Sequence, residues 1–180
     1  NGFLNVALGM SLVGLRPIVE IMFADFLPTG GDAIVNQLPK YRYMSGGQIR
    51  CPMVMRGPSG AAAQVAAQHS QAFESWFVHI PGLVVVMPST PRDAKGLLKS
   101  AIRDDNPVIF IEHEYLYGQR GEVPDDEDHV VEFGEAAIRR EGRDVTIIGI
   151  SRMAVTAERA AEQLAERHEI EAEVIDPRTL

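Results

Sequence analysis

Six short runs of apolar residues, rich in β-branched side chains, limit how this chain can fold. Most of them are continuous and do not alternate with polar residues, which is typical of strands covered on both faces of a parallel sheet. Patterns with helical spacing lie between them, so the chain is predicted to repeat strand, helix and strand. The expected fold class is α/β, a parallel sheet with helices on both faces. The runs occupy residues 17–23, 52–55, 82–88, 107–112, 145–150 and 172–175.

One helix can be placed from local chemistry alone, in the segment that follows the third run. Thr90 is a suitable N-cap, Pro91 suits the first helical position, and Asp93 favours the positive end of the helix dipole. An apolar stripe with helical spacing follows, and Pro107 then opens the next strand. The stripe consists of Ala94, Leu97, Leu98, Ala101 and Ile102.

The composition changes in the acidic, turn-forming stretch at 117–129, which predicts an exposed loop. A new strand–helix–strand unit is expected after it, with its helix at 153–167. We therefore predict a first domain at 1–125, a linker at 126–143 and a second domain at 144–180. Both domains are expected to be incomplete. The sequence begins abruptly at Asn1, within residues that belong to the first domain, and the two-stranded sheet of the second domain cannot bury both of its faces.

The charge and cysteine content exclude some classes of protein. The net charge is −8 and basic residues do not cluster, which argues against nucleic acid as a partner. No apolar run approaches the ~20 residues that span a membrane. The single cysteine, Cys51, excludes an internal disulfide and fits a reducing compartment, so a cytoplasmic location is expected.

His69 is the strongest single candidate for a functional residue, because the sequence contains no nucleotide-binding loop and no zinc-binding spacing. It follows a glycine-rich loop after a predicted strand, where α/β sheets place ligands. It lies four residues before Phe73, which predicts a place near the start of a helix, on its apolar face. The alternative is a core histidine that a backbone carbonyl satisfies.

Two further segments allow both a functional and a structural interpretation. Met22, Phe23 and Phe26 end the first predicted strand, either as core residues or as an apolar shelf for a heteroaromatic ring. The segment 101–107 ends a helix with acidic and amide side chains. It is either a solvated helix end, or a place where terminal carbonyl and side-chain oxygens hold a monovalent cation.

Taken as an ordered set, six segments resemble the beta subunit of thiamine-diphosphate-dependent 2-oxo acid dehydrogenases, which include pyruvate, branched-chain 2-oxo acid and acetoin dehydrogenases. The resemblance implies a transketolase-like pyrimidine-binding domain, followed by the first βαβ unit of a transketolase C-terminal domain. The segments are GLRPIVEIMFADF, DAIVNQLPKYRYMSGGQ, PMVMRGPSG, AAQHSQAFESWF, HIPGLVVVMPSTPRDAKGLLKSAIRDDNPVIFIEHEYLYG and DVTIIGISR.

The resemblance also implies an activity and partners. The enzyme would be an α2β2 heterotetramer with a beta–beta contact, in which the alpha subunit holds the diphosphate and magnesium and the beta subunit holds the aminopyrimidine. The cofactor's ylid would attack the 2-oxo carbon, CO2 would leave, and the acyl group would pass to lipoamide on a lipoyl-bearing acyltransferase. The glutamate that activates the pyrimidine would lie just before Asn1, so the chain is expected to be inactive alone.

Site residues follow from the same resemblance. It assigns Phe26 to stacking on the pyrimidine, Met22 to a neighbouring place in that pocket, and His69 to the substrate or lipoamide side. It also implies a structural potassium site, whose ligands would come from Met53, Ala101, Ile102, Asp104 and Asn106.

Two alternatives stay open from the sequence. One is a non-catalytic remnant of this fold that self-associates or serves as an interaction module. The other is another transketolase-type enzyme, such as a deoxyxylulose-phosphate synthase, which fits less well because it predicts one long chain.

Overall fold

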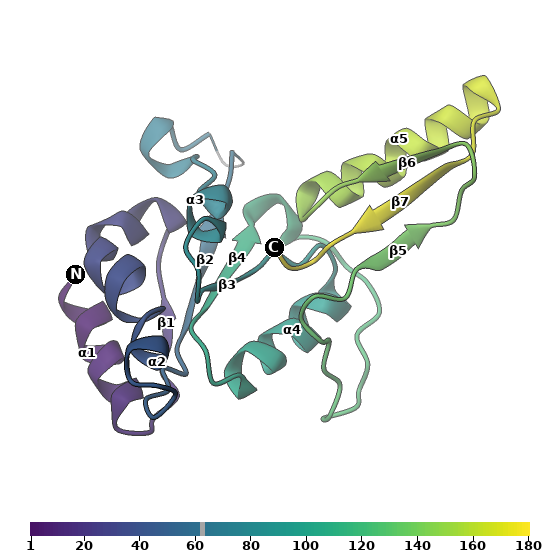
Figure 1. Ribbon diagram of the computed structural model, residues 1–180. Helices are drawn as coiled ribbons and strands as arrows, with labels where there is room; N and C mark the ends of the chain where they lie inside the picture. The colour runs from purple at the N-terminus through teal and green to yellow at the C-terminus, as the bar shows by residue number, and fades with distance from the viewer. Residues whose placement is uncertain (62–63) are drawn as a thin grey trace.

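The computed structural model describes residues 1–61 and 64–180, which form two sheets joined by a long connection (Figure 1). The first sheet has the strand order β1-β2-β4-β3, and all of its pairs are parallel. This confirms the predicted parallel α/β fold. Its strands are β1 (Ile18–Glu20), β2 (Val54–Ser59), β3 (Val84–Val86) and β4 (Val108–His113).

The continuous apolar runs reflect burial on both faces of this sheet. Ile109 and Ile111 of β4 belong to one core cluster, whereas Val108 and Phe110 belong to the other. Because successive side chains in a strand point to opposite faces, both faces must be apolar. The absence of alternation was therefore the correct sign of a doubly covered sheet.

Helical segments cover the two faces unequally. One face carries α1 (Gly2–Leu12), the 3₁₀ helix η1 (Ala24–Gly30), the π-helical η2 (Ala33–Gln37) and α3 (Glu74–Val78). The other carries α4 (Pro91–Arg103), whose Leu97 and Ala101 pack on the strands. The shorter elements are α2 (Tyr41–Met44), η3 (Ala67–His69) and η4 (Glu114–Leu116).

The predicted start of α4 is confirmed. Pro91 is the first helical residue, and Thr90 Oγ1 accepts a hydrogen bond of 3.0 Å from the Asp93 amide. Such a cap satisfies one of the amides that have no partner within the helix. Local chemistry was sufficient here because cap and helix are adjacent in the chain.

The second sheet has the order β5-β7-β6 and carries α5 (Arg152–His168). Its parallel pair, β6 (Val145–Ile148) and β7 (Ala172–Asp176), flanks α5 as the predicted βαβ unit. The additional strand β5 (Ala137–Arg140) pairs antiparallel with β7, so the stretch predicted as a linker, 126–143, contains a strand. Its short, polar pattern, AIRR, gave no sign of a strand. The domain boundaries themselves stay a prediction.

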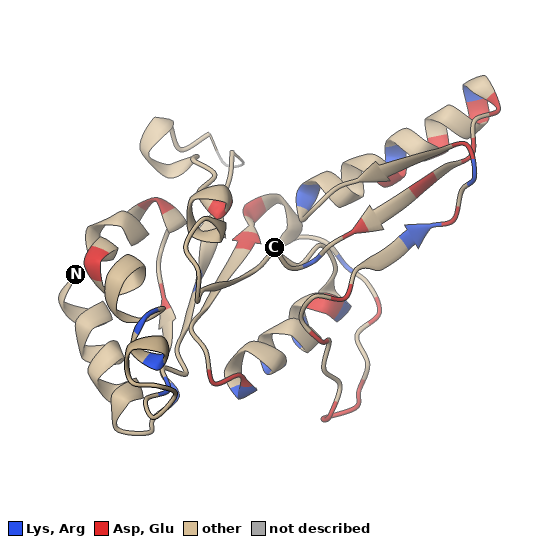
Figure 2. Cartoon of the chain, viewed as in Figure 1, with Lys and Arg blue, Asp and Glu red and all other residues tan. Residues whose placement is uncertain are grey.

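Charge is distributed unevenly over the elements, as Figure 2 shows. The first helix, α1, has no charged side chain, whereas α5 and the strands β5 and β7 carry several. Within residues 1–61 and 64–180, no helix has both the length and the apolar character needed to cross a membrane.

Candidate functional site

The candidate site lies where β1 and β2, neighbours in the sheet, reach their carboxyl ends. Parallel strands end at one edge, so the segments that follow them meet there. The 3₁₀ helix η1 follows β1, and the loop that contains His69 follows β2. Gly57 of β2 allows the residue after β1 to pack closely against it, because a Cβ atom on Gly57 would stand 2.4 Å from the carbonyl oxygen of Ile21.

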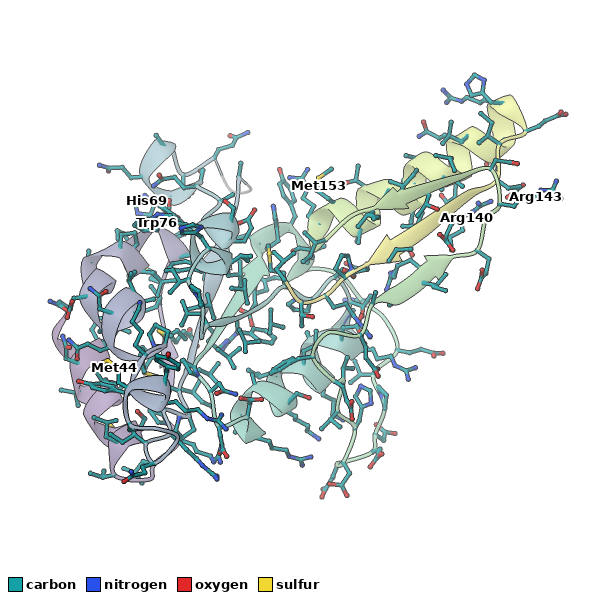
Figure 3. All side chains as sticks on the ribbon, viewed as in Figure 1. Met44, His69, Trp76, Arg140, Arg143 and Met153 are labelled. Carbon is teal, nitrogen blue, oxygen red and sulfur yellow. The ribbon has the colours of Figure 1, made fainter. Side chains whose placement is uncertain are left out.

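Three aromatic rings form the centre of this edge, and we call them the aromatic triad: Phe23, Phe26 and His69. The His69 ring centroid lies 4.7 Å from that of Phe23 and 5.3 Å from that of Phe26, both in edge-to-face geometry. Phe26 remains 38% exposed, and His69, labelled in Figure 3, is partly buried. The sequence analysis had therefore named two residues that the fold does bring together.

Asp25 anchors the His69 loop to η1. Its Oδ1 accepts hydrogen bonds from the backbone amide and the side-chain amide of Gln71, at 3.1 and 3.0 Å. The hydroxyl of Ser59 donates to the Gln71 carbonyl at 3.0 Å. Sequence reasoning missed Asp25. The available signal was an acidic residue between two aromatic residues, in the segment FADF (23–26).

The local setting of His69 differs from the prediction. His69 is the last residue of the short turn η3, and α3 begins only at Glu74, so His69 and Phe73 do not share a helix. Ala66, just before the turn, has a φ of 65°, a backbone conformation that interrupts helix formation. The prediction that His69 lies near the start of a helix, on its apolar face, was therefore wrong. The contacts of His69 come from tertiary structure.

Met22 lies between β1 and η1, and its side chain is largely exposed. It extends the apolar surface at this edge without belonging to the aromatic triad.

The oxygens predicted to hold a cation gather at the C-terminal end of α4, where arginines contact several of them. Arg16 Nη1 donates to the carbonyl oxygens of Ile102 and Asp104, at 3.2 and 2.7 Å. Arg42 donates to Oδ1 of Asn106 at 2.6 Å. The Asp104 side chain accepts from the Asn106 backbone amide at 2.7 Å. The structure thus places positive charge among these oxygens.

The remaining two predicted ligands lie in the core. The Met53 carbonyl accepts from the Val108 amide at 2.9 Å, and Ala101 is buried in α4. A carbonyl oxygen has two lone pairs and can accept again. Carbonyl, amide and carboxylate oxygens suit a hard cation. These oxygens are of the kinds that a monovalent cation binds, but Arg16 contacts two of them, and the cation site stays a prediction.

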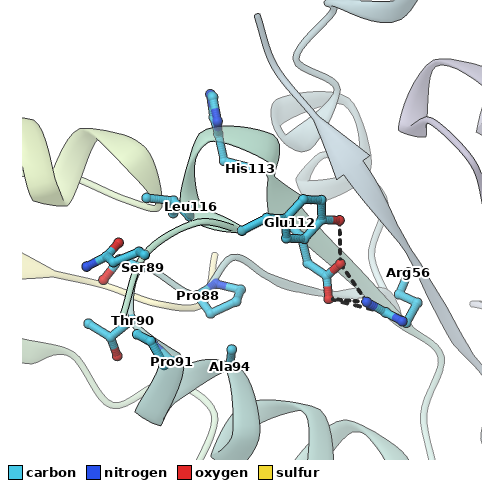
Figure 4. Close-up of a pocket in the computed structure, with 11 residues that line it drawn as sticks. Arg56, Pro88, Ser89, Thr90, Pro91, Ala94, Glu112, His113 and Leu116 are labelled. Carbon is cyan, nitrogen blue, oxygen red and sulfur yellow. Dashed lines mark hydrogen bonds and ion pairs between the residues drawn. The ribbon is translucent and has the colours of Figure 1, made fainter. Parts of the chain in front are cut away.

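A second cluster of polar groups, not anticipated from the sequence, lies at the ends of β2 and β4 beside a cavity of about 290 Å³ (Figure 4). Arg56 forms a two-pronged ion pair with Glu112, with N–O distances of 2.9 and 2.8 Å from Nη2. The Tyr117 hydroxyl donates to Glu112 at 2.8 Å. The available signal was a pair of opposite charges at the ends of two apolar runs, with Arg56 directly after 52–55 and Glu112 as the last residue of 107–112.

Burial shifts two ionisation equilibria near this cluster. Burial, with the hydrogen bond to Glu112, raises the pKa of Tyr117. Burial, with the positive charge of Arg152 nearby, lowers the pKa of His113. Tyr117 is therefore a protonated hydrogen-bond donor at neutral pH, and His113 is a neutral imidazole.

The site can be tested for its fit to a heteroaromatic cofactor. The partly exposed Phe26 ring offers an apolar face for stacking. One residue earlier, Asp25 Oδ2 is buried and has no hydrogen-bond partner among the described residues. An aromatic ring that carries an amino group supplies both an apolar face and a donor. The residues present fit an aminopyrimidine.

A doubly covered parallel sheet with aromatic rings at its strand ends, followed by a smaller α/β unit, is typical of α/β proteins that bind ligands at the carboxyl ends of their strands. Residues 1–119 match the transketolase pyrimidine-binding domain, and residues 134–180 match the transketolase C-terminal domain. The chain belongs to the transketolase pyrimidine-binding domain family.

Several relatives are beta subunits. The chain is 53% identical to the pyruvate dehydrogenase E1 component subunit beta of Rhizobium meliloti, over 100% of this chain and 39% of that protein. It is 51% identical to the mitochondrial counterpart of Caenorhabditis elegans, over 99% and 51%. It is 50% identical to the acetoin:2,6-dichlorophenolindophenol oxidoreductase subunit beta of Cupriavidus necator, over 100% and 53%.

A solved structure shows the same fold. The structure titled "Split gene transketolase, inactive beta4 tetramer" aligns with a TM-score of 0.75 and 26% identity, over 99% of this chain and 54% of that one. The chain thus spans about half, or less, of the length of these relatives. The resemblance noted in the sequence is confirmed.

Proposed function

We propose that the chain is the beta-subunit portion of a 2-oxo acid dehydrogenase, which decarboxylates a 2-oxo acid on thiamine diphosphate and transfers the acyl group to lipoamide. The aromatic triad at the carboxyl-end edge of the sheet carries this proposal. The relatives, about 50% identical over almost the whole chain, support it.

Each candidate residue has a role in this proposal. Phe26 stacks on the aminopyrimidine, Met22 extends the same apolar pocket, and Asp25 Oδ2 accepts a hydrogen bond from the ring's amino group. When bound, thiamine diphosphate supplies the nucleophilic carbon and the electron sink for decarboxylation. His69, with an exposed edge beside Phe26, contacts the substrate or the lipoamide.

The remaining parts of the proposed enzyme come from partner proteins. An alpha subunit holds the diphosphate and magnesium in an α2β2 assembly that includes a beta–beta contact, and a lipoyl-bearing acyltransferase receives the acyl group. We therefore propose that these 180 residues are not competent alone. Potassium is held by oxygens of Met53, Ala101, Ile102, Asp104 and Asn106. A cytoplasmic location stays a prediction.

The cofactor role of Phe26 can be tested in an assembly with the alpha subunit, with pyruvate and 2-oxoisovalerate as substrates. Phe26→Ala is expected to weaken thiamine diphosphate binding about tenfold, because aromatic stacking contributes ~0.5–1.5 kcal/mol beyond the buried area. The change is measured as a shift in the cofactor concentration that gives half-maximal CO2 release. Phe133→Ala, which removes a partly buried ring in the other cluster, is the control. Equal cofactor affinity in both variants would contradict the role.

A non-catalytic, self-associating module is the second candidate function. The uncharged helix α1 favours it, because Phe3, Val6, Met10 and Val13 are exposed at helical spacing. The two functions differ in a direct experiment: a catalytic beta portion gains turnover when the alpha subunit is added, and a self-associating module does not.

A further inference from the structure

The turn between β6 and α5 holds Ser151 in an unusual backbone conformation. Its φ is 55° and its ψ is −129°, a combination that side-chain-bearing residues rarely adopt. The turn is also tight: a Cβ atom on Gly149 would lie 2.7 Å from the carbonyl oxygen of Met153. Non-glycine residues persist in such conformations where the surrounding structure requires them, and they cluster at functional sites.

The Ser151 side chain is buried without a partner. The residue is 2% exposed, and its Oγ makes no hydrogen bond within residues 1–61 and 64–180. A buried hydroxyl normally has a partner. The N-terminal amides of α5 do not use it, since Met153 and Ala154 donate to the carbonyls of Ile150 and Ser151.

Ser151 lines a cavity of about 270 Å³ that lies between the first sheet and the start of α5. Figure 3 shows Met153, another lining residue, at that end of α5. Most of the wall is apolar, from Met87, Ile111, Ile150 and Met153. The cavity lies below the range of about 300–1,000 Å³ that drug-sized ligands need, so its occupant must be small.

The charged groups of the wall have opposite signs. Arg152 contributes a guanidinium, which donates to the Ala61 carbonyl at 3.3 Å and lies 4.1 Å above the Tyr115 ring. These contacts hold the guanidinium between Ala61 and Tyr115. Glu74 contributes a carboxylate, and His113 is the remaining titratable group. The lowered pKa of His113 makes it neutral at pH 7.

We propose that this cavity binds a small α-amino acid with an apolar side chain. The ligand carboxylate pairs with Arg152 and accepts from the Ser151 hydroxyl, and the ammonium group pairs with Glu74. The apolar side chain lies among the methionines and isoleucines. Opposite wall charges match a zwitterion, whereas a simple acid would leave Glu74 unpaired and a simple amine would leave Arg152 unpaired. The site is separate from the aromatic triad and does not depend on the proposed function.

Valine is the probe that tests the proposal. Isothermal titration of the 180-residue chain with L-valine is expected to give saturable binding at millimolar concentration. Isovalerate lacks the amino group and isobutylamine lacks the carboxylate, so each should bind at least tenfold more weakly. No saturable binding of valine, or equal binding of all three compounds, would overturn the proposal.

Ser151→Gly separates binding from folding. Glycine adopts the conformation at 151 without strain, so the variant is expected to melt a few degrees higher while it binds valine at least tenfold more weakly. Glu169→Gly is the matched control, because Glu169 has a φ of 57° at the other end of α5. It should be similarly stabilised and bind valine normally. Unchanged binding in Ser151→Gly, or equal loss in both variants, would refute the assignment.

Glu74→Gln tests the ammonium partner. The variant is expected to lose the preference for valine over isovalerate and to keep its binding of isovalerate. A retained preference would show that Glu74 does not recognise the amino group, contrary to the proposal.

Discussion

At the residue scale, His69 owes its position to contacts with residues distant in the sequence. Its ring packs edge-on against Phe23 and Phe26, and the Asp25–Gln71 hydrogen bonds hold its loop to η1. The ring itself is only partly buried. Its replacement should therefore affect chemistry more than stability.

His69→Ala is expected to reduce acyl transfer to lipoamide about 100-fold in the assembled enzyme, as is typical for the loss of a positioned proton-transfer group. Assays of lipoamide-dependent turnover and of CO2 release to an artificial acceptor would separate the steps. The melting temperature should change by no more than about 2 °C, since little buried area is lost. His79→Ala, at an exposed histidine, is the control. Unchanged lipoamide turnover would contradict the assigned role.

The Glu112 carboxylate is the buried side of an ion pair in the sheet. Its side chain is 13% exposed and that of Arg56 is 29% exposed, whereas Glu20, which contacts Arg56 from outside at 2.9 Å, is 72% exposed. The loss of one partner leaves a desolvated charge unpaired, which costs more than the pair itself contributes.

Glu112→Gln is expected to destabilise the fold by about 2–3 kcal/mol, or roughly 4–10 °C in melting temperature for a chain of this length. Glu20→Gln should shift the melt by less than about 2 °C, because exposed pairs contribute little. The double variant Arg56→Met with Glu112→Met should recover most of the loss. Thermal melts of all four proteins test this, and equal effects of the two single variants would rule out the difference in burial as the cause.

At the element scale, the C-terminal end of α4 depends on positive charge supplied from elsewhere in the chain. A helix ends with unpaired carbonyls and a partial negative charge. Arg16 and Arg50 both contact Asp105, at 2.5 Å each, but only Arg16 also contacts backbone carbonyls of this helix end. The hydrogen bond from Arg16 lowers the pKa of Asp105. Arg16 and potassium are therefore expected to compete for the same oxygens.

Arg16→Met is expected to make stability depend on potassium. In tetramethylammonium chloride the variant should melt several degrees lower than in potassium chloride, because a cation that binds only the folded state stabilises it. The unsubstituted chain should show a smaller difference, since Arg16 already occupies two of the oxygens. Arg50→Met removes a charge without freeing a carbonyl and serves as the control. A variant that melts identically in both salts would exclude the cation site.

At the scale of the whole molecule, one exposed surface remains apolar. The stripe of Phe3, Val6, Met10 and Val13 runs along α1, at the side of the first sheet away from the second sheet (Figure 1). Water-exposed apolar stripes of this kind favour association with another chain. Since α1 has no charge, nothing on this helix opposes such a contact.

Val6→Glu is expected to shift the chain towards a monomer by placing a charge in this stripe. The Val6 side chain is 64% exposed, so the fold should keep its melting temperature within about 2 °C. Light scattering after size-exclusion chromatography measures the mass. Asn5→Glu adds the same charge on α1 outside the stripe and should leave the mass unchanged. If both variants retain the mass of the original chain, the stripe is not the contact.

Much of the fold could be predicted from the sequence because its causes are local. The Thr90 cap is three residues from the amide it satisfies, and the apolar runs record burial on both faces of one sheet. Because the segments that follow parallel strands meet at one edge of the sheet, the sequence also predicted that Phe26 and His69 lie together. Strand β5 was missed because pairing with β7 decides it, and its residues carry no apolar pattern.

By itself the sequence determined the fold class, the family and two members of the aromatic triad, since periodicity, capping and ordered segments are properties of neighbouring residues. Only the tertiary structure decided which groups satisfy one another. Gln71 is 46 residues from Asp25, Glu112 is 56 from Arg56, and the carbonyl of Asp104 is 88 from Arg16. The physical reason is that a buried charge or a helix end needs a partner in space, and chain order does not specify which distant residue supplies it.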